Sequence, residues 1–165
     1  MNIDELKKCI DDIDKDDLVK LENIINNRKN IIIIGNGGSN AVASHISQDY
    51  TKALGKRALS FSDSSRLTCY MNDYGVEQAY IKFIEHFAYS DTLIILISSS
   101  GNSLNIINSV EYCNNSKLDV ITLSGFDKDN KLNQLSNNSI LHFWVNSNDY
   151  GIVECTHEII LHSII

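Results

Sequence analysis

Four consecutive isoleucines, Ile31–Ile34, constrain the fold of this chain more than any other feature. A continuous β-branched run of this kind is typical of a strand that is buried on both faces, as in the centre of a parallel sheet. Similar apolar runs occupy residues 92–97, 118–123 and 140–145, and a weaker one occupies residues 57–61. We interpret each of these runs as a strand.

Segments with helical character separate the expected strands. We expect helices at residues 3–28, 40–54, 66–72, 76–88, 103–114 and 129–136, and from Tyr150 to the end. Strands that alternate with helices predict a three-layer α/β/α sandwich around a mostly parallel, doubly wound sheet. With 165 residues and no low-complexity linker within them, the chain is expected to form one domain over residues 1–165 that includes an N-terminal helix at about 3–28.

The composition limits the classes of partner. The formal net charge is −7, which argues against nucleic acid or a membrane surface, because phosphate backbones are bound by basic patches. No apolar run approaches the roughly 20 residues of a membrane span. The first residues are acidic where a secretory signal would be basic, so we expect a cytoplasmic protein. We interpret its four irregularly spaced cysteines as reduced core thiols.

Two loops rich in small residues follow two of the expected strands. They read Gly35-Asn36-Gly37-Gly38-Ser39 and Ser98-Ser99-Ser100-Gly101-Asn102-Ser103. Both lie beyond the carboxyl ends of strands, where α/β sheets bind ligands. Glycines let backbone N–H groups approach an anion, and the helix that follows points its positive end at the same place. The sequence therefore predicts a phosphate site, although a tight turn or a simple helix cap would also explain either loop alone.

Titratable residues on two expected helices suggest a metal site. His45 and Asp49 are four residues apart and lie on one helix face, a spacing that can ligate a metal. A plain surface pair is the alternative. The last helix offers Glu154, Glu158 and two histidines, of which spacing alone selects no particular pair.

GNGGS after a strand, ISSSGNS after a later strand, and a last helix with His157 and His162 together resemble the SIS (sugar isomerase) domain. Within that family the chain is similar to the phosphoheptose isomerases, over nearly its whole length. The resemblance implies isomerisation of sedoheptulose 7-phosphate to glycero-manno-heptose 7-phosphate through an enediol. It also implies substrate or phosphate contacts from Asn36, Gly37, Gly38, Ser39, Asn72, Asp73, Ser98, Ser99, Ser100 and Ser103.

The same resemblance implies a divalent metal, expected to be Zn²⁺, bound by His45, Asp49, Glu154 and His162. It assigns catalysis to Asp49 as the base and His162 as the group that transfers protons. Two positions depart from the family, which has glutamate in place of Asp49 and glutamine in place of Glu154. Both departures keep oxygen ligands, so we expect metal binding to survive more surely than heptose specificity. These donors do not select Zn²⁺ over Mn²⁺, Fe²⁺ or Ni²⁺.

Two other functions remain open. One is a non-catalytic module that binds sugar phosphates or other proteins, and the other is an SIS enzyme acting on a shorter sugar phosphate. The resemblance further implies a homotetramer with sites shared between subunits and a place in lipopolysaccharide or capsule synthesis. We also expect the last helix to continue beyond His162, near which the given sequence stops.

Overall fold

A five-stranded sheet forms the centre of the computed structural model, which describes residues 1–165. Its strands are β1 (Asn30–Gly35), β2 (Arg57–Ser60), β3 (Leu93–Ser98), β4 (Val120–Ser124) and β5 (Leu141–Trp144). They lie in the order β2-β1-β3-β4-β5, and every neighbouring pair is parallel. The five expected strands are confirmed. The two central strands, β1 and β3, are buried along almost their whole length, as their β-branched runs predicted.

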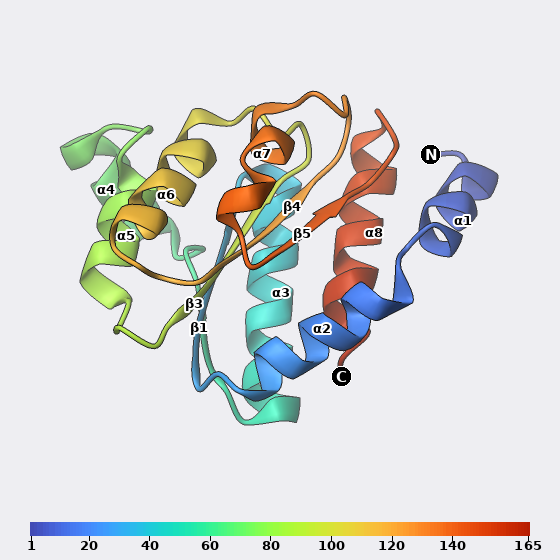
Figure 1. Ribbon diagram of the computed structural model, residues 1–165. Helices are drawn as coiled ribbons and strands as arrows, with labels where there is room; N and C mark the ends of the chain where they lie inside the picture. The colour runs from blue at the N-terminus through green and yellow to red at the C-terminus, as the bar shows by residue number, and fades with distance from the viewer.

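Helices cover both faces of the sheet, which confirms the doubly wound three-layer sandwich (Figure 1). One face carries α2 (Lys15–Asn26), α3 (Gly37–Leu54) and α8 (Tyr150–His162). The other face carries α4 (Ser64–Tyr74), α5 (Ala79–Phe87), α6 (Leu104–Asn115) and α7 (Lys131–Gln134). The remaining helix, α1 (Ile3–Asp11), packs against α8 at the edge of the molecule.

The prediction of one helix over residues 3–28 is wrong, because the helix is interrupted between α1 and α2. Asp14 has an extended backbone, and its Oδ1 accepts a hydrogen bond from the N–H of Asp16 at 2.8 Å. This bond starts a new helix, since an aspartate at the N-cap satisfies a free backbone donor. The apolar spacing continues across the break and therefore does not reveal it.

The sequence places a turn at residues 72–75, between the helices expected at 66–72 and 76–88, and this position is also wrong. Helix α4 continues to Tyr74, so Asn72 and Asp73 lie in its last turn. The chain turns at Gly75, whose φ of 81° suits glycine. On the other side of the sheet, α3 begins at Gly37, three residues before its predicted start. Gly37 and Gly38 of the first loop thus belong to the first turn of the helix.

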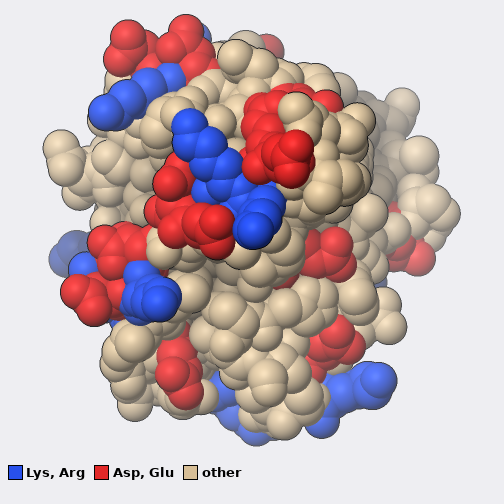
Figure 2. Space-filling view, turned by 90° about the vertical axis from the view of Figure 1, so that its right-hand side faces the viewer, with Lys and Arg blue, Asp and Glu red and all other residues tan.

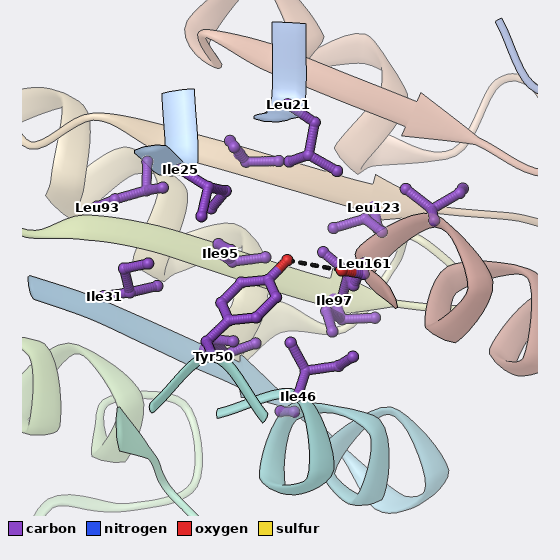
Figure 3. Close-up of a cluster of buried hydrophobic side chains, with 14 of the residues drawn as sticks. Leu21, Ile25, Ile31, Ile46, Tyr50, Leu93, Ile95, Ile97, Leu123 and Leu161 are labelled. Atoms are coloured by element: carbon purple, nitrogen blue, oxygen red, sulfur yellow. Dashed lines mark hydrogen bonds between the residues drawn. The ribbon is translucent and has the colours of Figure 1, made fainter. Parts of the chain in front are cut away.

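The apolar cluster under α2, α3 and α8 holds the two site-bearing helices, α3 and α8, on the same face (Figure 3). Leu21 and Ile25 from α2, and Ile46 from α3, pack over the isoleucines of β1 and β3. Each fully buried side chain of this size contributes roughly 1.5–3 kcal/mol through removal of its surface from water. Among them, Tyr50 donates a hydrogen bond to the carbonyl oxygen of Leu161 at 2.9 Å. This bond joins α3 directly to α8.

On the face that α1 and α8 present, acidic and basic side chains are interspersed (Figure 2). None of the helices combines the length and the apolar character that crossing a bilayer requires. All four cysteines are free thiols, but the expectation of core positions is wrong for Cys69, which is exposed, while Cys155 is half-buried.

Candidate functional site

The first loop connects β1 to α3. Asn36 occupies the N-cap position, yet its side chain makes no capping hydrogen bond, so the first N–H groups of α3 lack a side-chain cap. Gly37 has a φ of 54°, a conformation that favours glycine. A Cβ atom at Gly38 would overlap the carboxylate of Glu154 where it now lies, so a side chain at this position would require Glu154 to move. The loop therefore presents bare backbone at the positive end of a helix.

The second loop connects β3 to α6. Ser98 and Ser99 are buried, with 4% of each exposed. Ser103 stands at the N-cap of α6 but caps no backbone N–H, and its Oγ accepts a hydrogen bond from Ser98 Oγ at 3.2 Å. Helix capping thus does not account for this hydroxyl. Asn102 is committed elsewhere, because its Oδ1 accepts the N–H of Lys131 at 3.1 Å.

The two loops meet around one hollow of about 310 Å³. The Oγ atoms of Ser39 and Ser99 lie 3.2 Å apart and join the loops directly. The hollow is lined by Asn36, Gly37, Gly38, Ser39, Ser98, Ser99, Ser100, Ser103, Tyr150 and Glu154. All eight predicted loop residues are thus brought together. Glu154 is the one charged residue of this lining, so an anion held here is bound by N–H groups and hydroxyls.

The side chain of Asn36 turns away from a ligand role. Its amide exchanges two hydrogen bonds of 3.0 Å with the amide of Asn105 in α6. The hydroxyl of Tyr80 donates to the same Asn36 Oδ1 at 2.6 Å and to the carbonyl oxygen of Gly35 at 2.9 Å. Both acceptor positions of Asn36 Oδ1 and one of its two Nδ2 hydrogens are therefore already engaged. Tyr80 and Asn105 were not predicted from the sequence as functional residues. The one feature that could have pointed to either is the polar Asn105 within the apolar first turn of α6.

A cluster of two histidines and one carboxylate joins α3 to α8. His45 and Asp49 come from α3 and His162 from α8, and one ligand atom from each lies within 4.8 Å of the others. Asp49 Oδ2 is 3.2 Å from His45 Nε2 and 3.1 Å from His162 Nε2. The hydrogen bond from His162, with the nearby charge of His45, holds the pKa of Asp49 below its usual range.

The other ring nitrogens of both histidines have acceptors outside the cluster. His45 Nδ1 lies 2.7 Å from Glu158 Oε1, and His162 Nδ1 lies 3.1 Å from the carbonyl oxygen of Glu158. A carbonyl only accepts, so Nδ1 of His162 carries the proton. In neutral rings with these tautomers, two Nε2 lone pairs and a carboxylate oxygen converge. A proton shared with Asp49 or a metal ion can occupy the space between these atoms, and histidine ligands of metals are oriented through the second nitrogen in this way. The cluster therefore fits a divalent metal ion.

Glu154 separates the cluster from the loops. It lines the loop hollow and also a neighbouring hollow of about 420 Å³, which His45 and Glu158 border. Burial raises the pKa of its carboxyl group. The residues whose potential ligand atoms lie within 4.8 Å of one another are His45, Asp49 and His162, and Glu154 is not among them. Three of the four predicted ligands therefore come together, and the fourth lies between the two parts of the site.

Like Asp49 and His162, the residues Asn72, Asp73 and His157 line neither hollow. Asn72 and Asp73 are exposed on α4, where the Asn72 amide donates to Asp73 Oδ1 at 2.9 Å. His157, which spacing alone had left open as a partner of Glu154, is fully buried, and its Nε2 lies 3.0 Å from the carbonyl oxygen of Ser124. This histidine is part of the core.

A family described as SIS domain matches residues 11–125. The chain belongs to the SIS domain family. The matched segment contains both loops of the SIS domain together with His45 and Asp49, and it ends before α8. The half of the site that α8 contributes is therefore known from the geometry described above.

Known relatives of this SIS domain include phosphoheptose isomerases. The one from Buchnera aphidicola is 36% identical over 129 residues, covering 75% of this chain and 66% of the relative. The one from Fusobacterium nucleatum is 40% identical over 113 residues, covering 66% and 58%. The solved phosphoheptose isomerase of Neisseria gonorrhoeae superposes with a TM-score of 0.84 at 25% identity, covering 96% of this chain and 88% of that one. The matches thus span no more than about two thirds of the curated relatives' length.

Proposed function

We propose that this chain is a sugar-phosphate aldose–ketose isomerase that converts sedoheptulose 7-phosphate to glycero-manno-heptose 7-phosphate. One observation carries the proposal: Glu154 lines both the loop hollow and the neighbouring hollow that His45 of the His45–Asp49–His162 cluster borders. Both ends of a sugar phosphate, the phosphate and the reacting carbons, would then have a partner. The similarity to phosphoheptose isomerases supports this substrate.

The phosphate end would be held without any lysine or arginine. The N–H groups at the start of α3 and the hydroxyls of Ser39, Ser98, Ser100 and Ser103 would serve as donors. Hydrogen bonds to an ionised acceptor are roughly twice as strong as neutral ones, so several converging donors can replace a cation. The start of α6 adds the positive end of a second helix.

His45, Asp49 and His162 would hold the metal, with Glu154 as a fourth ligand once its carboxylate moves toward them. Two nitrogens and one oxygen suit Zn²⁺, which we propose as the ion. When bound, a divalent ion supplies Lewis acidity that polarises a carbonyl and offsets developing negative charge.

Asp49 and His162 would move the protons. Asp49, whose pKa is lowered, is ionised at neutral pH and accepts the proton from C1 of the ketose. His162, whose Nε2 lies 3.1 Å from Asp49 Oδ2, would transfer the hydroxyl proton from O1 to O2 through this nitrogen when it is not bound to the metal. Return of the first proton to C2 completes the aldose, with all atoms conserved. Aspartate is one methylene shorter than the glutamate of the family, so the substrate must sit closer to α3.

The direct test is incubation of the purified chain with sedoheptulose 7-phosphate and Zn²⁺. We expect an aldose 7-phosphate product, and loss of that product in an Asp49→Asn variant that folds normally. Parallel incubations with five- and six-carbon sugar phosphates separate this activity from that of other SIS enzymes. Absence of any aldose at high protein concentration would contradict the proposal.

A second candidate function is binding of sugar phosphates without turnover. The observation that favours it is Glu154, a carboxylate on the wall of a hollow that has no basic residue to balance it. Sugar-phosphate binding without product, in protein loaded with metal, would support this alternative.

We further propose that residues 1–165 form a single SIS domain in a cytoplasmic homotetramer that serves lipopolysaccharide or capsule synthesis, with no nucleic-acid or membrane partner. Because Asn72 and Asp73 line neither hollow of their own chain, their proposed contact with the sugar would be made in the site of another subunit. Light scattering at graded concentrations tests the tetramer.

A further inference from the structure

Two buried tyrosines, one on each face of the sheet, bond to backbone carbonyls beside the two halves of the site. We propose that Tyr80 is the positioning residue of the phosphate loops and that Tyr50 is the positioning residue of the metal cluster, each acting independently of the other. This inference rests on the proposed function, because that function assigns a sugar phosphate to the loops and a metal ion to the cluster.

Tyr80 holds the first loop to the second. Its hydroxyl donates to the carbonyl oxygen of Gly35, the last residue of β1, and to Asn36 Oδ1. Asn36 in turn exchanges hydrogen bonds with Asn105, two residues after Ser103 of the second loop. Tyr80 and Asn105 are almost fully buried, with 2% and 5% exposed. The chain Tyr80–Asn36–Asn105 therefore fixes the distance between two loops that the sequence places far apart.

Tyr50 holds α3 to α8 at the level of the cluster. It directly follows Asp49, and its hydroxyl donates to the carbonyl oxygen of Leu161, which directly precedes His162 (Figure 3). Backbone carbonyls in the last turn of a helix have no N–H group further along the helix to pair with. The hydroxyl of Tyr50 supplies this missing donor to the carbonyl of Leu161. Its side chain is fully buried. This hydrogen bond therefore adds a directional contact to the apolar packing between the helices that carry Asp49 and His162.

The sheet separates the two tyrosines. Tyr50 belongs to the apolar cluster under α2, α3 and α8, whereas Tyr80 belongs to the cluster under α5 and α6. They share no hydrogen-bond partner. Effects of mutations at sites without shared partners usually add, so the loss of one hydroxyl should leave the other half of the site intact.

The experiment compares Tyr80→Phe with Tyr50→Phe, each serving as the matched control for the other. Calorimetry on metal-free protein gives the affinity for sedoheptulose 7-phosphate, and competition with a chelating dye on sugar-free protein gives the affinity for Zn²⁺. Each variant removes one buried hydroxyl, so both should lower the midpoint of thermal unfolding by about 2–4 °C.

The affinities should separate the two variants. We expect Tyr80→Phe to weaken sugar-phosphate binding about tenfold, the effect of about one lost hydrogen bond, and to leave Zn²⁺ affinity within about twofold. We expect Tyr50→Phe to weaken Zn²⁺ binding about tenfold, again the effect of about one lost hydrogen bond, and to leave sugar-phosphate affinity within about twofold. An Asn105→Ala variant, which breaks the same chain from its other end, should reproduce the Tyr80→Phe pattern.

Equal changes in both affinities, or no change in either despite lower thermal stability, would overturn the inference and make the tyrosines general stabilising residues. If the unaltered chain bound one ligand only, the half of the inference that concerns the other ligand would be wrong. If it bound neither, the proposed function itself would be wrong, and the inference would fall with it.

Discussion

At the scale of residues, the orientation of two imidazole rings determines what the cluster can bind. Both rings engage an acceptor of Glu158 through Nδ1, the carboxylate for His45 and the backbone carbonyl for His162. Their Nε2 atoms therefore converge on Asp49. Glu158 thus acts as an outer partner of the cluster rather than as one of its ligands.

Glu158→Leu should weaken Zn²⁺ binding roughly 10–100-fold, because the loss of an outer-shell carboxylate frees the ring of a ligating histidine. Glu158→Gln keeps a hydrogen-bond acceptor of the same shape, so we expect a smaller loss. Competition with a chelating dye measures both variants. Unchanged affinity in Glu158→Leu would show that His45 needs no external support.

Glu154→Gln should strengthen binding of sugar phosphate to metal-free protein at neutral pH, because it removes the one charge in the lining of the loop hollow. Burial raises the pKa of Glu154, so the wild-type carboxylate gains its proton at a higher pH than an exposed glutamate. The advantage of the variant should therefore shrink as the pH falls. The substrate phosphate titrates equally with both proteins, so the ratio of their affinities isolates Glu154. A ratio that does not vary with pH would contradict this role.

The residues that sequence reasoning found are those with local signals. The loop residues belong to short motifs, and His45 and Asp49 share a helix face. Tyr80 and Asn105 were missed, and Glu158 was considered only as a possible ligand, because each acts on a segment distant in sequence. His45 and Glu158 are separated by 113 positions, and Asn36 and Asn105 by 69. Pairings of this kind depend on how layers pack, which no local spacing encodes.

At the scale of elements, polar capping determined the boundaries that periodicity missed. The strands were predictable because their β-branched runs are long and buried. The break between α1 and α2 was not, because Asp14 competes with a continuous helix through one hydrogen bond of 2.8 Å.

Asp14→Ala should lower the free energy of unfolding by about 0.5–2 kcal/mol, the usual cost of losing an N-cap. Urea unfolding measures the change. Asp12→Ala is the control, because this residue lies in the same connection but caps no helix start. Equal losses in both variants would indicate that the charge, rather than the cap, stabilises this corner.

At the scale of the whole molecule, α8 completes the site and also anchors it in the core through His157. Burial lowers the pKa of His157 to about 4, and burial likewise lowers the pKa of His142 on β5 to about 4. Both rings are therefore neutral in the folded state. The unfolded chain binds these protons below pH about 6.5, so folding stability must fall as the pH drops from about 6.5 toward 4.

The free energy of unfolding should therefore decrease by about 3 kcal/mol for His157 alone across that window. Urea unfolding at several pH values measures the decrease, and a His157→Gln variant should show a shallower pH dependence together with lower stability at pH 7. A variant as acid-sensitive as the wild type would exclude His157 as the cause.

In the proposed isomerase, the loops hold a phosphate while Asp49 and His162 move protons on the sugar. Proton NMR of sedoheptulose 7-phosphate in D₂O, with Zn²⁺ and the purified chain, tests this most directly. We expect an aldose 7-phosphate signal and incorporation of deuterium at the carbons that exchange a proton. With the Asp49→Asn variant we expect neither the aldose nor the deuterium incorporation. A ketose that binds but stays unlabelled, with no aldose formed, would contradict this mechanism.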